Sequence, residues 1–254
     1  MKDVHGANDR VSAPPTMDLE RLVAELAKLT PDWHAHGLFS QRATSALVRH
    51  AKPNVQHSLE TGAGRSTILL SHISPQHTVF TVADDSLAAT LESPLLRRES
   101  LTVVEGPTQT TLPQHKFEHE IDLALLDGPH AYPFPDLEYF YVYPHLSTGA
   151  LLVLDDVHIP TVNNLFRFVR EDVMFEPVDV VGTTAFLRRT SAPSFPTGQD
   201  GWETQRYNLD RFPLSGWPAW GGPRPRMRNL VPLRVRRLVK GALPKRLRQW
   251  LISS

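Results

Sequence analysis

The sequence predicts an α/β fold, with a doubly wound and mostly parallel sheet that carries helices on both faces. Three observations lead to this expectation: short apolar runs alternate with amphipathic segments, a glycine-rich turn follows the first run, and several runs end in aspartate. Continuous apolar runs are typical of strands buried on both faces. Their alternation with helices requires parallel pairing through right-handed crossovers.

The elements can be placed along the chain from their periodicity. Apolar residues at three- and four-residue steps predict helices at 17–29 and 40–50, and a helix start at 66–72. Apolar or β-branched runs predict strands at 55–61, 78–83, 101–105, 121–126 and 150–154, followed by a late hairpin at 178–181 and 184–187.

Composition limits the class of protein. The 254 residues are 41% apolar and 21% charged, which is ordinary for a globular chain with a sizeable core. The absence of cysteine excludes disulfides, Cys-ligated zinc and thiol nucleophiles. No apolar run is long enough to span a bilayer and no secretory signal is evident, so the default expectation is the cytoplasm, with a peripheral position at the membrane as an option.

The chain divides by composition into four parts. We expect a flexible leader at 1–16, the α/β domain with its N-terminal helices at 17–190, an extension rich in Pro, Gly and Trp at 191–229, and a basic amphipathic tail at 230–254.

Charge is distributed unevenly. Ten Lys or Arg and no Asp or Glu lie between Arg224 and Ser254, so the rest of the neutral chain is acidic. Basic residues interleaved with Leu, Val and Trp250 favour attraction of residues 230–252 to an anionic membrane surface. Docking of the tail onto the protein's own acidic body, or disorder, is an equal alternative. Nucleic acid is not expected, because few aromatic residues are available to stack on bases.

The turn after the first strand indicates a nucleotide-like ligand. It reads Glu60-Thr61-Gly62-Ala63-Gly64-Arg65-Ser66, with a strand before it and a helix start after it. Glycines let a ligand approach bare backbone at a helix N-terminus. A dinucleotide fold would place a third glycine where Thr67 stands, and the Glu60 carboxylate would repel a pyrophosphate but suit an ammonium group. S-adenosylmethionine has an ammonium group and no phosphate, so charge favours it over NAD.

An acidic pair follows the second strand. Asp84 or Asp85 can accept hydrogen bonds from ribose hydroxyls, and the register leaves both open. The alternative interpretation is that the glycines form only a tight turn and that these acids are solvated turn residues.

These motifs together resemble the class I S-adenosylmethionine-dependent methyltransferases. The likeness rests on Glu-x-Gly-x-Gly, on the acid after the second strand, on Asp127-Gly128-x-His130, and on Asp155-Asp156, and it covers about residues 35–190. The chain is most similar to the metal-dependent small-molecule and sugar O-methyltransferases, of the family 24 type. The resemblance implies a Rossmann-like, seven-stranded sheet whose last hairpin is antiparallel. The residues then expected to bind S-adenosylmethionine are Glu60, Thr61, Gly62, Gly64, Ser66, Asp84, Asp85 and Asp127.

Aspartates also end the later strands. Asp127, Asp155 and Asp156 would converge at one sheet edge if those strands are neighbours, and a divalent cation would relieve their repulsion. All-oxygen ligation suits Mg²⁺. His130 is the candidate catalytic base, since imidazole titrates near neutral pH and the related enzymes use this histidine so. Many metal-dependent relatives carry Asp-Asn where this chain has Asp155-Asp156.

The function predicted is methyl transfer to a hydroxyl of a small molecule, sugar or glycan. Two alternatives stay open: an NAD-type oxidoreductase, and a non-catalytic scaffold on a degenerate methyltransferase fold. Turn chemistry at Asp127-Gly128, helix capping by Asp155 and a structural role for His130 are the corresponding non-catalytic interpretations. A homo-oligomer is compatible with the sequence, which does not specify the oligomeric state.

Overall fold

The computed structural model describes residues 18–29, 39–195, 201 and 205–211. They fall into two compact units. The first extends to Ser194, apart from a short piece at Glu171–Val173, and holds every strand of the described residues. The second begins at Phe195 and contains the helix α8 (Arg206–Arg211). The predicted leader, the basic tail and most of the predicted extension lie outside the described residues.

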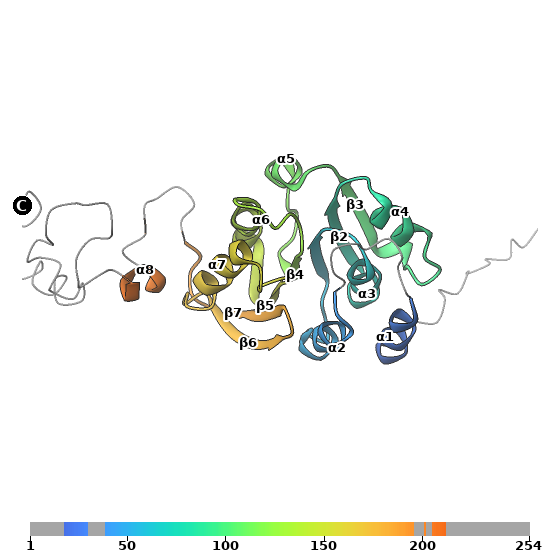
Figure 1. The fold of residues 1–254 in the computed structure, drawn as a ribbon, viewed down its shortest axis with the longest axis horizontal. Helices are drawn as coiled ribbons and strands as arrows, with labels where there is room; N and C mark the ends of the chain where they lie inside the picture. Colours follow the sequence, from blue (N-terminus) through green and yellow to red (C-terminus); the bar gives the residue numbers. More distant parts are fainter. Residues whose placement is uncertain (1–17, 30–38, 196–200, 202–204, 212–254) are drawn as a thin grey trace, which may run out of the picture. The chain divides into compact units, whose positions relative to one another are not determined.

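The first unit is built on one seven-stranded sheet (Figure 1). Its spatial order is β3-β2-β1-β4-β5-β7-β6. The first five strands along the chain pair in parallel, and β7 runs antiparallel to both of its neighbours. The predicted α/β class is therefore confirmed, including the antiparallel final hairpin. The strands are β1 (His57–Thr61), β2 (Gln76–Thr81), β3 (Leu101–Glu105), β4 (Ile121–Leu126), β5 (Leu146–Leu154), β6 (Phe175–Val181) and β7 (Thr184–Arg189).

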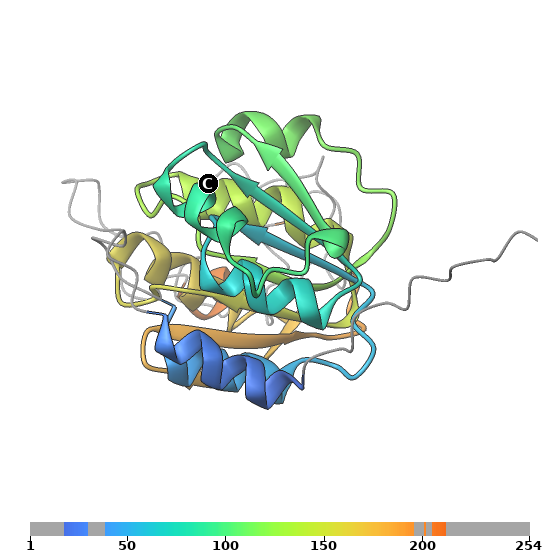
Figure 2. The same cartoon turned by 90° about the vertical axis from the view of Figure 1, so that its right-hand side faces the viewer.

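Helices cover both faces of this sheet (Figures 1 and 2). One layer consists of α1 (Leu19–Lys28), α2 (Gln41–His50), α3 (Arg65–Ile73) and α4 (Asp85–Glu92). In this layer α1, α2 and α3 contact one another, and α4 packs against α3. The other consists of α5 (Thr108–Thr111), α6 (Phe134–Val142) and α7 (Pro160–Val169). Short 3₁₀ turns join them to the strands at η1 (Arg98–Ser100), η2 (Leu112–Gln114) and η3 (Tyr143–His145).

The helix starts follow from local sequence. Asp18 and Ser40 cap α1 and α2 by accepting hydrogen bonds from the backbone N–H groups of Glu20 and Ala43. Such a cap contributes about 1 kcal/mol, because it satisfies a donor that the first helical turn leaves free. Both predicted N-terminal helices are therefore present, one or two residues shorter at their starts.

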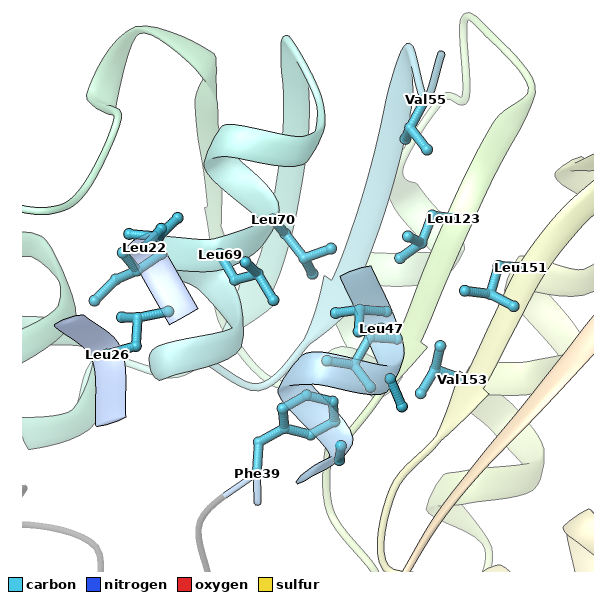
Figure 3. Packing of buried hydrophobic residues seen from close by; sticks show 14 of the residues in the cluster. Leu22, Leu26, Phe39, Leu47, Val55, Leu69, Leu70, Leu123, Leu151 and Val153 are labelled. Carbon is cyan, nitrogen blue, oxygen red and sulfur yellow. The ribbon is translucent and has the colours of Figure 1, made fainter. Parts of the chain in front are cut away.

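A leucine-rich core joins the first helical layer to the sheet (Figure 3). Leu69 and Leu70 of α3 are completely buried, and so are Leu47 of α2 and Leu123 of β4. Burial of each such side chain stabilises the fold by about 2 kcal/mol. The core fixes α3, and with it the turn that precedes α3 at the carboxyl end of β1.

No helix in the described ranges is both long and apolar enough to cross a membrane.

Candidate active site

The turn between β1 and α3 is called the glycine turn here (residues 60–67). Its conformation is fixed by backbone geometry and a backbone hydrogen bond. Gly62 has φ of 86°, in the left-handed region, and its N–H donates to the Phe80 carbonyl at 2.9 Å. A Cβ at this position would lie 2.5 Å from the carbonyl oxygen of Asp127. Only glycine allows β1 and β4 to approach so closely at their carboxyl ends.

Glu60 has a different environment from the one that the sequence predicts. Its side chain is buried, with Oε2 accepting from Thr67 Oγ1 at 2.7 Å and lying 3.3 Å from His77 Nε2. Thr67 Oγ1 in turn accepts the Gly64 N–H at 2.9 Å. Glu60 therefore supports the turn from behind and does not line the ligand cavity, because its carboxylate already has internal partners.

A cavity of about 630 Å³ opens at the carboxyl ends of β1, β2, β4 and β5. This is the edge of a parallel α/β sheet at which ligands bind. The cavity is lined by seven of the predicted site residues, namely Gly62, Asp84, Asp85, Asp127, His130, Asp155 and Asp156. The predicted residues Glu60, Thr61, Gly64 and Ser66 are not among its lining residues. Sequence reasoning missed several others that are, among them Ala63, Val82, Ser86, Thr108, Gln109 and Phe134.

The acidic pair after β2 lies at one side of this cavity. Asp84 is the N-cap of α4, and its Oδ1 accepts from the Leu87 N–H at 2.9 Å. Asp85 begins that helix and is exposed. Both remain candidates for the ribose hydroxyls, with Asp84 additionally committed to its helix.

Three side chains at the other side of the cavity form what we call the Asp–His cluster: Asp127, His130 and Asp156. One ligand atom from each lies within 4.8 Å of the others. His130 Nε2 is 3.5 Å from both Asp127 Oδ1 and Asp156 Oδ2, and it makes no well-formed hydrogen bond with the described residues. The His130 carbonyl accepts a hydrogen bond from Thr161 Oγ1 at the start of α7, which fixes the loop that carries the imidazole.

Asp156 adopts an uncommon backbone conformation. Its φ of 53° is left-handed, a region that costs a residue other than glycine about 1 kcal/mol or more. The Asp156 carbonyl accepts the Ile159 N–H at 2.9 Å, which closes the turn after β5. In this turn the Asp156 carboxylate lies beside the imidazole, with Oδ2 3.5 Å from His130 Nε2.

Of the predicted metal ligands Asp127, Asp155 and Asp156, the cluster contains the first and the last, while Asp155 lines the same cavity beside it. Its Oδ1 accepts from Thr184 Oγ1 of β7 at 2.6 Å, and its side chain is buried. The sequence could not show this contact, because β7 reaches the site only through its antiparallel insertion beside β5. His130 takes the third place in the cluster.

The cluster carries more negative charge than its surroundings compensate. Burial raises the pKa of Asp127 to about 7, and the neighbouring carboxylates of Asp155 and Glu60 add to the increase, against the opposing effect of His130. Burial likewise raises the pKa of Asp155. The Asp127 carboxylate raises the pKa of His130 in spite of burial.

These features fit a divalent cation. Two carboxylates face an imidazole nitrogen that has no hydrogen-bond partner among the described residues, and a positive charge there would stabilise the ionised form of Asp127, which burial disfavours. Oxygen ligands favour Mg²⁺, whereas inclusion of the His130 nitrogen would favour Mn²⁺ or another transition metal.

Comparison with known proteins agrees with this geometry. Residues 34–157 match a protein family described as a methyltransferase domain. Among solved structures, an O-methyltransferase from Bacillus cereus in complex with S-adenosylhomocysteine is 12% identical, with a TM-score of 0.52 over 72% of this chain and 94% of that one. The S-adenosylhomocysteine-bound methyltransferase PaMTH1 of Podospora anserina is 14% identical, with a TM-score of 0.51 over 76% of this chain and 100% of that one. No curated protein sequence matches the chain.

The sheet has a Rossmann-like fold, which it shares with the solved methyltransferases above, and residues 34–157 match a methyltransferase domain.

Proposed function

We propose that this protein transfers a methyl group from S-adenosylmethionine to a hydroxyl oxygen of a small molecule, sugar or glycan, with a divalent cation at the Asp–His cluster. One observation carries the proposal: the glycine turn, the acidic pair after β2 and the Asp–His cluster all line a single cavity. A donor held at the first two would present its reactive end to the third.

Different residues of the cavity are proposed to bind the donor and to hold the cation. Gly62 offers close backbone approach beside β1, and Asp84 or Asp85 accepts hydrogen bonds from the ribose hydroxyls. When bound, S-adenosylmethionine supplies an electrophilic methyl group, and a cation held by Asp127 and Asp156 supplies charge that stabilises an acceptor alkoxide.

His130 is proposed as the base. Its Nε2 takes the acceptor hydroxyl proton as the new oxygen–carbon bond forms and the sulfur–carbon bond breaks, which leaves a methyl ether, S-adenosylhomocysteine and a protonated imidazole. The two carboxylates 3.5 Å from Nε2 stabilise that imidazolium. His130 cannot bind a cation and accept a proton through Nε2 at once, so its role as base requires Asp127 and Asp156 to hold the cation without it.

Calorimetric titration of the full chain with S-adenosylmethionine, S-adenosylhomocysteine and NAD tests the donor. We expect the first two to bind and NAD not to bind. Binding of NAD alone would overturn the proposal in favour of an oxidoreductase.

Cation dependence is tested by methyl transfer to a panel of phenols, sugars and glycans, with and without a chelator. We expect the chelator to abolish transfer and Mg²⁺ or Mn²⁺ to restore it. Asp156→Ala should abolish it as well, whereas Asp179→Asn, which removes a carboxylate outside the cavity, should not. Transfer that survives both the chelator and Asp156→Ala would remove the cation from the mechanism.

We further propose that residues 230–252, which lie outside the described residues, bring the enzyme to an anionic membrane surface. The support is their charge pattern alone. Co-sedimentation with anionic and with neutral vesicles, for the full chain and for a chain lacking residues 230–254, tests this. Equal behaviour of the two chains would contradict it.

A further inference from the structure

A buried carboxyl group lies behind the site and is used by none of the steps above. Glu138 belongs to α6, is 2% exposed and does not line the large cavity. It also belongs to none of the sequence motifs. A buried carboxyl is expensive to retain without a partner, so its contacts are informative.

Those contacts link the end of β1, at Thr61, to Asp127, the residue that follows β4. The Asp127 backbone N–H donates to Thr61 Oγ1 at 3.0 Å, and Thr61 Oγ1 donates to Glu138 Oε2 at 2.8 Å. A hydroxyl has one proton, so Thr61 can accept from Asp127 only when its own proton is directed elsewhere. Glu138 provides the acceptor that keeps the Thr61 lone pairs facing Asp127.

The same carboxyl explains the glycine after Asp127. A Cβ on Gly128 would lie 2.0 Å from Glu138 Oε1, 2.6 Å from Cδ and 2.7 Å from Oε2. Gly128 is not among the glycines with positive φ, so its backbone does not require glycine. A side chain at position 128 would therefore have to displace the Glu138 carboxyl from its place beside Thr61.

We infer that Glu138 is a positioning residue, which holds the backbone of Asp127 and Gly128 against the glycine turn through Thr61. The expected effect of Glu138 on cation binding and methyl transfer rests on the proposed function. Its expected effect on the Asp127 backbone does not, so the experiment can distinguish an error in this inference from an error in the proposed function.

The test compares Glu138→Gln, which keeps an oxygen acceptor for Thr61, with Glu138→Met, which has a similar length and no acceptor. In Glu138→Met we expect hydrogen exchange at the Asp127 amide to accelerate at least tenfold, and Mn²⁺ affinity to fall about 10- to 100-fold. Glu138→Gln should stay within about threefold of the wild type in both measurements, since its amide oxygen replaces Oε2.

Thr61→Val removes the same link without altering the carboxyl, and serves if Glu138→Met does not fold. It should reproduce the loss of Asp127 amide protection, and the double variant should be no worse than either single one, because the residues act in one chain. Unchanged protection of Asp127 in Glu138→Met and in Thr61→Val would overturn the inference. Altered protection in a protein that transfers no methyl group would uphold it and contradict only the proposed function.

A second measurement uses the glycine. Gly128→Ala should lower thermal stability in the wild-type background and have little effect in a Glu138→Ala background, where the space is free. Gly62→Ala is the matched control: its clash is with the Asp127 carbonyl, so Glu138→Ala should not rescue it. Equal effects of Gly128→Ala in both backgrounds would count against the inference.

Discussion

Two polar groups of similar composition are built on this sheet, and they differ in how fully their side chains are hydrogen-bonded. The network behind the glycine turn consists of Glu60, Thr67, His77 and Ser58; Ser58 Oγ is 2.9 Å from His77 Nδ1, and all four side chains are buried. The Asp–His cluster also combines carboxylate and imidazole. Yet the distances from His130 Nε2 to both carboxylates are 3.5 Å, and this nitrogen makes no well-formed hydrogen bond within the described part of the chain.

The difference suggests that the first group has a structural role and the second a functional one. Side chains whose hydrogen bonds are all satisfied within the protein, as in the first, closed network, stabilise the fold and have no groups left for a ligand. Two neighbouring carboxylates with few partners, as in the open Asp–His cluster, destabilise the ligand-free protein, and a bound cation would remove their repulsion. Substitutions should therefore act in opposite directions: in the closed network they should lower stability, and in the open cluster they should lower activity at little or no loss of stability.

The largest expected effect is on the rate at the open cluster. His130→Gln should reduce methyl transfer by roughly 10²- to 10⁴-fold, as loss of a general base does. Affinity for S-adenosylhomocysteine and the melting temperature should remain near their wild-type values. Mn²⁺ affinity measured in the same variant distinguishes the two roles of His130: an unchanged value supports the base, and a large loss identifies a ligand.

The next effect is on stability at the closed network. His77→Leu leaves the buried Glu60 carboxylate without one of its partners and should lower the free energy of unfolding by about 3 kcal/mol. Ser58→Ala, at the outer end of the same network, should cost about 1 kcal/mol. Denaturant unfolding measures both, and equal losses would mean that the network is not organised around Glu60.

A smaller effect concerns pH in the cation-free protein. Because the pKa of Asp127 is raised to about 7, the unfolded chain loses this proton first, and the native state loses stability as pH rises from about 4 to 7. A shift of about 3 pKa units corresponds to about 4 kcal/mol, which solvent screening of this partly exposed side chain reduces to on the order of 2 kcal/mol. Glu138, whose pKa burial also raises to about 7, acts in the same direction, so the difference between wild type and Asp127→Asn isolates Asp127. A parallel pH profile in that variant would show that Asp127 ionises normally.

The smallest effect on stability is expected at Asp156. Asp156→Gly relieves the left-handed φ but frees the unfolded chain, so the free energy of unfolding should change by less than about 1 kcal/mol. Loss of Mn²⁺ binding should accompany it. Retained binding would exclude Asp156 as a ligand.

The fold was predictable where burial on both faces imposes a continuous apolar run. The predicted bounds of β3 and β4 match those observed, whereas β5 begins at Leu146 rather than at Ala150. The early part of β5 contains Gly149, which interrupts the apolar pattern. β6 begins at Phe175 rather than at Val178, since Pro177 disfavours a strand and is tolerated here beside a register shift in the outermost strand.

The site was predictable to the extent that each residue follows a strand. The positions of Asp84, Asp85, Asp127, His130 and Asp156 at one cavity come from the rule that parallel strands end at the same edge. The directions of side chains do not follow from that rule. Charge alone predicted a ligand contact for Glu60, although Thr67 and His77 turn it inward. Glu138 gave no sequence signal, because a single carboxylate within a helix resembles any solvated residue.

The bond from Thr184 to Asp155 has a consequence for biosynthesis. Asp127 and Asp155 end strands that are translated early, but Thr184 opens β7, the last strand of the sheet to leave the ribosome. A nascent chain that stops before residue 184 would lack this bond and leave the Asp155 carboxylate without its Thr184 partner. The environment of Asp155 is therefore complete only once the final hairpin has been synthesised.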